Sequence, residues 1–273
     1  MDIDENLTEL FGAFIGDGWI ESRTKNSLYI LGSPIEDKNY YDYRISYLVK
    51  KVLKCKFKIR LFKYWHVYGL VIYNKAVISK LIELGFLYGK KVHKVSIPDN
   101  LLNKNKNLLP TIVRGIFDTD GSFYCKRSYG QYGSTFRKKF HCYPRLEIVS
   151  ISLKLLKQVH GILTELGIKS TLRNGNVKGL YNKNSHQSYR LTIFSIHNIV
   201  LFFKIIKPKN QRHITRYRVW KKFGFLPPKT SLDERKKILK NVLNPYKYYA
   251  GVPERSNGLD FSTKHRRKAN LKS

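Results

Sequence analysis

The chain has 273 residues, of which 42% are hydrophobic, enough to give one large domain or two ordinary ones a packed core. This composition excludes a disordered polymer. Lysine and arginine total 52 against 19 acidic residues, a formal net charge of +33 that is extreme for an enzyme of small metabolites and indicates a polyanionic partner, most commonly nucleic acid. A lysine-rich genome or a basic tail is the alternative, but the charge is spread along the whole chain.

Cysteine usage and the N-terminus point to a reducing compartment. Cys55, Cys125 and Cys142 cannot all pair and have no CxxC spacing, so we expect neither a disulfide framework nor a zinc site. The acidic start "MDIDENL" lacks the features of a signal peptide, and no apolar run approaches the ~18 residues of a membrane span. We expect a soluble intracellular protein without a membrane partner; a prokaryotic cytoplasm and an organelle matrix are not distinguished.

Apolar periodicity predicts two series of elements in the same order. The first is a helix over 6–18, strands over 19–23 and 27–31, a helix over 40–53, strands over 56–63 and 67–73, and a helix over 74–85. The second is a helix that ends at 121, strands over 122–127 and 145–150, a helix over 152–167, strands over 168–173 and 188–194, and a helix over 195–206. Asn6 is the expected N-cap of the first helix and Gly18 its left-handed C-terminal residue.

The repeated order predicts the fold class. It is α+β, with two pseudo-symmetric αββαββα repeats, each a four-stranded antiparallel sheet with helices on one face. We assign residues 1–104 to the first repeat, 105–225 to the second and 226–273 to a basic C-terminal extension. In the extension, Ser231 and Glu234 form a capping-box pattern for a helix over 232–243, and "KHRRK" at 264–268 is expected to contact phosphates or to stay disordered.

Strand alternation predicts what the open face of each sheet does. In "KFKIRLFK", the basic residues point one way while Phe57, Ile59 and Leu61 point toward the core. An ordinary solvated face is the alternative, but the charge favours contacts in the major groove of DNA. Strands of this length predict a target of roughly 15–20 base pairs for two sheets. The predicted DNA-binding residues are Trp19, Glu21, Arg23, Lys56, Lys58, Arg60, Ser122, Tyr124, Lys126, Arg145, Glu147, Arg190 and Thr192.

Two helices end in a carboxylate followed by glycine, 120 − 17 = 103 residues apart. Gly12 and Gly16 share one helix face, and Gly115 and Thr119 share the corresponding face after Pro110 in the first turn. For one copy, a glycine face that packs on its own core and an ordinary C-terminal turn would suffice. If the two faces pack together, however, both carboxylates lie at the negative ends of their helices and repel each other. A divalent cation such as Mg²⁺ would relieve this repulsion and could support phosphodiester hydrolysis.

At "LFGAFIGDG" (10–18) and "VRGIFDTDG" (113–121), the chain resembles the LAGLIDADG homing endonucleases in the single-chain form with two motif copies, over about residues 5 to 220. The resemblance implies that Asp17 and Asp120 are catalytic and bind Mg²⁺ or another divalent cation such as Mn²⁺, aided by the carbonyls of Gly16 and Thr119. It also implies a saddle of two sheets on double-stranded DNA and cleavage that leaves short 3′ overhangs.

Family members often carry a basic residue near each active site. Lys90 or Lys91, and Lys207 or Lys209, stand in the expected regions, and Lys91 and Lys209 are our choices for a role in catalysis. A plain phosphate contact is an equally good reading of each. Ile15 replaces the middle acid that Asp118 retains, at a position that is variable in the family.

The leading function is therefore a site-specific DNA endonuclease, expected to be a monomer. An RNA-splicing maturase acting on intron RNA is the alternative, and a non-catalytic DNA-binding regulator is disfavoured because both closing acids are present. The chain starts with Met and ends "NLKS", without the splicing residues of an intein, so an intron-encoded or freestanding protein is expected.

Overall fold

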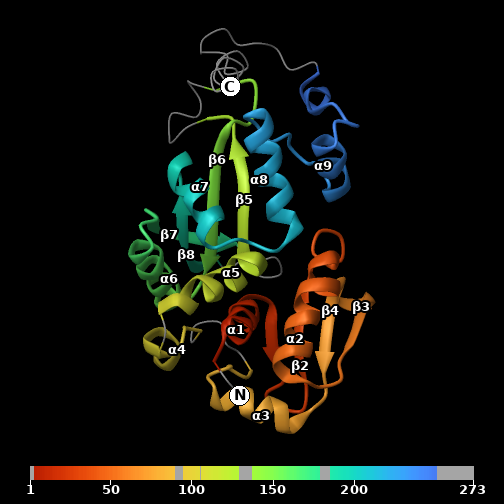
Figure 1. Ribbon diagram of the computed structural model, residues 1–273, viewed down its shortest axis with the longest axis vertical. Helices are drawn as coiled ribbons and strands as arrows, with labels where there is room; N and C mark the ends of the chain where they lie inside the picture. The colour runs from red at the N-terminus through yellow and green to blue at the C-terminus, as the bar shows by residue number, and fades with distance from the viewer. Residues whose placement is uncertain (1–2, 90–94, 105, 129–136, 179–184, 251–273) are drawn as a thin grey trace, which may run out of the picture. The chain divides into compact units, whose positions relative to one another are not determined.

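A computed structural model describes residues 3–89, 95–104, 106–128, 137–178 and 185–250 (Figure 1). The chain divides into two compact units: the first comprises Met1–Ser122 and Leu146–Gln211, and the second comprises the rest. Within the described parts of the chain, no helix is both long and apolar enough to cross a membrane.

The first sheet consists of β1 (Gly18–Ile20), β2 (Leu28–Gly32), β3 (Lys58–Phe62) and β4 (Val67–Ile72). The strands are antiparallel in the order β1-β2-β4-β3, so the hairpin of β3 and β4 adds to β2 through β4. The associated helices are α1 (Glu5–Asp17), the π-helix η1 (Tyr40–Ile45), α2 (Ser46–Leu53) and α3 (Lys75–Glu83). One sheet face, with Ile20, Leu28, Ile30, Leu70 and Ile72, is buried in the core.

The second sheet repeats this arrangement. Its strands β5 (Gly121–Lys126), β6 (Tyr143–Ser150), β7 (Thr171–Lys178) and β8 (Ser185–Ile193) lie in the order β5-β6-β8-β7. The helices are α5 (Leu109–Asp120), α6 (Leu153–Glu165) and α7 (Ile196–Ile205), preceded by α4 (Asp99–Lys104) and the short 3₁₀ turn η3 (Lys106–Leu108). The predicted α+β class, with two four-stranded antiparallel sheets in matching order, is confirmed.

Three elements follow the repeats: α8 (Gln211–Phe223), α9 (Leu232–Leu239) and the 3₁₀ helix η4 (Pro245–Tyr249). The capping box of Ser231 and Glu234 forms as predicted. The helix after it ends at Leu239 and not at 243, because Asn241 turns left-handed with φ 60° and Val242 donates back to the carbonyl of Lys237. We did not predict α8, which has a low density of apolar residues. The basic stretch 264–268 lies outside the described residues.

Both predicted ends of α1 are wrong. The N-cap is Asp4, whose Oδ1 accepts the Leu7 N–H at 2.8 Å, while Asn6 lies in the first turn. A carboxylate is the better cap because it also faces the positive end of the helix dipole. Gly18 is extended, with φ −85° and ψ 151°, because the chain enters β1 directly. Glycine is needed there for space, since a Cβ would lie 2.1 Å from Cδ2 of Phe14.

The strand predicted over 19–23 is shorter than expected, because Glu21 ends it. The Glu21 carboxylate accepts the backbone N–H groups of Arg23 and Thr24, each at 2.6 Å, and that of Lys25 at 3.1 Å. These bonds form a turn in place of the strand ladder. The hydrogen bond from the Thr24 hydroxyl, together with these backbone bonds, lowers the pKa of Glu21 to about 2.

Candidate active site at the paired glycine helices

The helices α1 and α5 lie side by side with their backbones in close contact (Figure 1). A Cβ on Gly12 would lie 2.2 Å from the carbonyl oxygen of Ile112, and a Cβ on Gly115 would lie 2.2 Å from the carbonyl oxygen of Glu9. Each glycine therefore lacks a side chain at a point where the other helix presents its backbone. The two helices meet through their small faces, as the spacing of the glycines predicted.

The packing brings the C-terminal ends of both motif helices together. A Cβ on Gly16 would lie 3.1 Å from the carboxyl carbon of Asp120, so the Asp120 carboxylate lies against the α1 backbone one residue before Asp17. Asp120 is exposed and Asp17 is partly exposed. Gly16 and Asp120 also line a cavity of about 250 Å³. Its other lining residues are Ile15, Val95, Val149, Ser150 and Ile151.

Asp17 is held by a residue that we did not predict. The hydroxyl of Tyr41 donates to Asp17 Oδ2 at 2.6 Å, and a Cβ on Gly32 would lie 3.1 Å from the same oxygen. Burial and the neighbouring Asp17 charge raise the pKa of Tyr41 well above its usual value, so this hydroxyl remains a donor at neutral pH. Tyr41 therefore fixes the orientation of one carboxylate of the pair.

Asp118, the middle acid of the second motif, is buried and binds a neighbouring segment of the backbone. It is fully buried, and its carboxylate accepts the backbone N–H groups of Lys209 at 2.7 Å and Asn210 at 3.1 Å. The Asn210 amide donates to the Asp118 carbonyl at 2.9 Å and to the buried carboxylate of Asp37 at 2.8 Å. Burial raises the pKa of Asp118 to about 7, although the two N–H donors act in the opposite direction.

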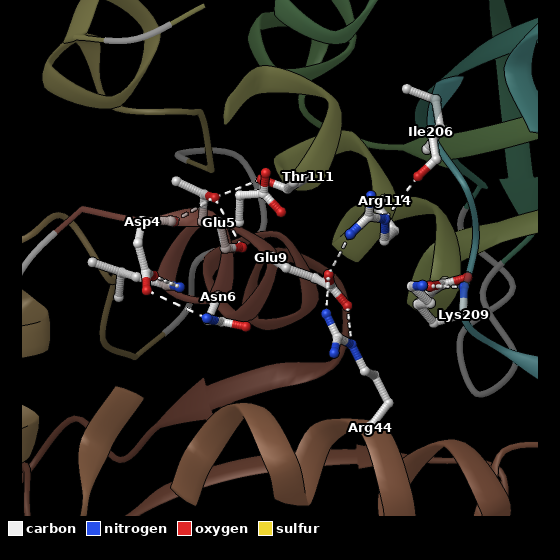
Figure 2. Close-up of polar contacts among 12 residues, drawn as sticks. Asp4, Glu5, Asn6, Glu9, Arg44, Thr111, Arg114, Ile206 and Lys209 are labelled. Atoms are coloured by element: carbon white, nitrogen blue, oxygen red, sulfur yellow. Dashed lines mark hydrogen bonds and ion pairs between the residues drawn. The ribbon is translucent and has the colours of Figure 1, made fainter. Parts of the chain in front are cut away.

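A buried ion network lies beside the helix contact (Figure 2). Glu9 receives two hydrogen bonds of 2.6 Å from the guanidinium of Arg44 and one of 2.8 Å from Arg114. Arg114 also donates to the carbonyl of Ile206 at 2.7 Å, which ties α5 to the end of α7. The hydroxyls of Thr8 and Thr111, 103 residues apart, hydrogen-bond at 2.5 Å. These contacts fix the relative placement of α1 and α5, and with it that of the two carboxylates.

The predicted lysines can be placed only in part. Lys90 and Lys91 lie outside the described residues. Lys207 and Lys209 are exposed, and Lys207 is left-handed with φ 52°. Because the Lys209 backbone is bonded to Asp118, which is two residues from Asp120 on α5, the segment with Lys209 is anchored to the second motif.

The predicted DNA-binding residues fall into three groups. Accessible strand residues are Trp19, Lys58, Arg60, Ser122, Tyr124, Lys126, Glu147 and Arg190. Glu21, Arg23 and Lys56 lie outside the strands, whereas Arg145 and Thr192 are strand residues that are buried. Glu147 and Arg190 form an ion pair at 3.1 Å. The prediction that Leu61 faces the core is wrong: it is 47% exposed, because β3 is the edge strand of its sheet.

The donor set fits a hard divalent cation. Asp17 and Asp120 supply carboxylate oxygens, and the C-terminal turns of α1 and α5 supply carbonyls, which are the ligands that Mg²⁺ prefers. Among the described residues, no group of three or more His, Cys, Asp or Glu is placed to hold a metal. A cation here would therefore need water or substrate phosphate as further ligands, which is the usual manner of Mg²⁺.

Comparison with known proteins gives a family match for the second half of the chain. Residues 111–207 match the family model of the LAGLIDADG-like domain, which confirms the resemblance at the second motif. The chain is also 27% identical over 234 residues to an ATP-dependent DNA helicase, Hel308, of Methanocaldococcus jannaschii. That alignment covers 77% of this chain and 16% of the helicase, so the chain spans about a sixth of the length of this curated relative.

Two solved structures are similar to this chain. The I-LtrWI LAGLIDADG homing endonuclease bound to target DNA is 12% identical, with a TM-score of 0.52, and the match covers 81% of this chain and 90% of that one. I-DmoI in complex with DNA and Ca is 16% identical, with a TM-score of 0.44 and coverage of 74% and 88%. At such identity, the likeness to I-LtrWI establishes a shared LAGLIDADG endonuclease fold.

Proposed function

We propose that this chain, whose residues 111–207 form a LAGLIDADG-like domain and which has the fold of the LAGLIDADG homing endonucleases, is a site-specific endonuclease for double-stranded DNA. The observation that carries the proposal is the pairing of Asp17 and Asp120 at adjoining ends of two helices in backbone contact. Each carboxylate lies at the negative end of its helix dipole, where a negative charge is unfavourable. This unfavourable placement occurs twice in the same place. Acids held together in an electrostatically unfavourable place are typical of a functional site.

In the proposed reaction, Asp17 and Asp120 would hold Mg²⁺ or Mn²⁺ together with the carbonyls of Gly16 and Thr119. The bound cation would neutralise phosphate charge and activate the attacking water. Tyr41 keeps the Asp17 carboxylate oriented through its 2.6 Å hydrogen bond. Lys91 and Lys209 are the proposed basic residues, which would stabilise the developing charge on the phosphate.

The proposed substrate is a long asymmetric DNA target. Two sheets placed as a saddle on the duplex would contact roughly 15–20 base pairs, and cleavage of both strands would leave short 3′ overhangs. The protein would act as a monomer, since one chain contains both motif helices and both sheets.

The test uses duplex DNA made by joining the two sequences that flank the gene. Wild-type protein with Mg²⁺ is expected to cut both strands at the junction and to fail in EDTA. Asp17→Asn and Asp120→Asn should lose cleavage but keep binding in a gel-shift assay. Asp233→Asn, a change to an exposed acid on α9, is the matched control and should cut normally.

Two outcomes would contradict the proposal. Cleavage of both strands by either active-site variant would show that the catalytic assignment is wrong. Acceleration of host-intron splicing by the purified protein, without cleavage of the junction duplex, would instead establish the alternative role as an RNA-splicing maturase.

A further inference from the structure

The last residue of β6 corresponds to the last residue of β2, the strand that ends beside Asp17. Gly32 pairs with Tyr68 in the first sheet, and Ser150 pairs with Tyr189 in the second. The two tyrosines open the matching sequences "YGLVIY" and "YRLTIF". Ser150 is therefore the counterpart of Gly32, and it adds a hydroxyl where the first repeat has no side chain.

Ser150 faces the helices of its repeat. Side chains alternate along a strand, so Ser150 shares one face of β6 with the buried Leu146 and Ile148. It is half-buried, and it lines the cavity of about 250 Å³ to which Gly16 and Asp120 also contribute. The Ser150 side chain thus shares a cavity with the carboxylate of the second motif.

The two repeats place a hydroxyl near their carboxylates in different ways. In the first repeat, residues 33–39 and the π-helix η1 lead to Tyr41, whose hydroxyl donates to Asp17 at 2.6 Å. Gly32 leaves space for this contact, since a Cβ there would lie 2.8 Å from the Tyr41 hydroxyl oxygen. In the second repeat, residues 151–152 alone link β6 to α6, so the end of the strand itself carries the hydroxyl.

Backbone contacts fix the position of the Ser150 hydroxyl. Its Oγ accepts the N–H of Ser152 at 3.1 Å, and the Oγ of Ser152 donates to the carbonyl of Val95 at 2.6 Å. A serine hydroxyl can accept hydrogen bonds and still donate its own proton. Ser150 therefore keeps a proton that it can donate to an acceptor in the cavity.

The cavity is large enough for water, which needs two to four polar partners at such a site. The Ser150 hydroxyl and the Asp120 carboxylate provide two of them, and most of the remaining wall is apolar. We infer that Ser150 is a positioning residue, which orients the Asp120 carboxylate through a water held in this cavity. Tyr41 orients Asp17 by a direct hydrogen bond instead. This inference rests on the proposed function, in which both carboxylates bind the cation.

The test compares Ser150→Val with Ser150→Thr, because valine and threonine have nearly the same shape and differ in the hydroxyl. The measured quantity is the affinity for Mn²⁺ without DNA, obtained from the electron paramagnetic resonance signal of the free ion. Ser150→Val is expected to bind Mn²⁺ about tenfold more weakly, as loss of a group behind a metal ligand does. Ser150→Thr should bind like wild type. So should Ser195→Ala, which removes an exposed hydroxyl at the start of α7.

Cleavage of a supercoiled plasmid that carries the junction sequence gives a second readout. Each carboxylate belongs to one of the two repeats, so Ser150→Val should slow the cutting of one strand more than the other. Nicked circles should then accumulate before linear DNA appears, as they should not with Ser150→Thr. Denaturant midpoints show whether the variants fold, and Ser150→Ala replaces Ser150→Val if the latter does not.

Equal Mn²⁺ affinity and equal strand rates in the valine and threonine variants would overturn the inference. A loss of affinity that Ser150→Thr shares would also overturn it, because the cause would then be added bulk. The Mn²⁺ titration uses no DNA. If wild type binds Mn²⁺ but fails to cut the junction, the proposed function is contradicted, and the metal affinities of the variants still decide the role of Ser150.

Discussion

Asp118 and Asp120 stand two residues apart on α5 and have opposite surroundings. Asp120 is exposed at the helix end beside Gly16, whereas Asp118 is fully buried and bonded to the backbone of the segment 209–210. The sequence presents them as similar acids of one motif. Their burial distinguishes them: Asp120 is exposed at the end of α5, whereas Asp118 is buried and anchors the chain that follows α7.

The buried Asp118 should make stability depend on pH. Its pKa of about 7 in the folded protein lies above the ordinary value of 3.8, so the folded state binds this proton more tightly than the unfolded chain. The free energy of unfolding should therefore fall by a few kcal/mol as pH rises from about 4 to about 7, and level off above it. The measurement is the difference in urea stability between wild type and Asp118→Asn; a difference that is constant over this range would contradict the shift.

Substitution of Tyr41 tests the proposed active site. Tyr41→Phe removes the hydroxyl that donates to Asp17, so the carboxylate loses its fixed orientation. Loss of such a partner behind a metal ligand typically costs about 10- to 100-fold in activity or metal affinity, and we expect a loss of this size in DNA cleavage and a higher Mg²⁺ requirement. Tyr40→Phe is the control, because the buried Tyr40 hydroxyl has no hydrogen-bond partner among the described residues. Equal rates for both variants would exclude an orienting role for Tyr41.

At the scale of elements, the contact of α1 and α5 is the feature on which the site depends. Glycines that would weaken an isolated helix allow two backbones to approach here, and the Glu9 network fixes their relative placement. The closing glycines, Gly18 and Gly121, are both extended and both lie against a phenylalanine of their own helix. The two motif copies therefore share one local design for turning a helix into a strand.

Replacing glycine by alanine should have opposite effects on stability at a helix contact and at an open helix position. Gly12→Ala places a methyl group 2.2 Å from the Ile112 carbonyl oxygen, and overpacking against a backbone should cost about 1–3 kcal/mol or more. Gly161→Ala in α6 is the matched control, since a Cβ there meets nothing within 4 Å and should stabilise the helix by roughly 0.5–1 kcal/mol. Denaturant midpoints give both values. A Gly12→Ala protein as stable as wild type would show that the helices can separate without loss.

The stability of the protein should also depend on the buried ion network around Glu9. Glu9→Gln removes the charge that faces Arg44 and Arg114 inside the protein, and breaking a buried ion pair from one side typically costs about 3–5 kcal/mol. Lys106→Ala, which removes an exposed ion pair with Glu165, is expected to change stability by less than about 1 kcal/mol. Equal, small effects in chemical denaturation would mean that the buried pair contributes little.

For the whole molecule, the formal charge of +33 should dominate association with nucleic acid. Each phosphate contact releases counterions, so the logarithm of the affinity for duplex DNA should fall linearly with the logarithm of salt concentration. With several such contacts, affinity should drop about 10³-fold or more between roughly 50 and 200 mM salt. Gel-shift or anisotropy titrations measure the slope. A flat response would contradict binding along the duplex backbone.

Much of the fold follows from the sequence, because strand alternation, helix periodicity and the repeated Asp-Gly ends are local signals. The pairing of Gly12 with Gly115 could be predicted from spacing alone. Tyr41 could not, since it is one of 19 tyrosines and meets Asp17 only after the chain folds back. The bond from Arg114 to Glu9 spans 105 residues and has no local signature. The strand at β1 was predicted, but its early end was not, because Glu21 bonds its own turn.

The bond between Glu9 and Arg114 also makes the two halves non-interchangeable. The repeat relates Glu9 to Ile112 and Arg114 to Phe11, each 103 residues away. The pair of positions that corresponds to Glu9 and Arg114 is therefore apolar. Two copies of the first half, joined through α1, would bring Glu9 against Phe11 and leave its carboxylate with Arg44 alone. A homodimer of first halves is thereby disfavoured, and the correct pairing of unlike halves is encoded by one asymmetric charge contact inside a symmetric helix pair.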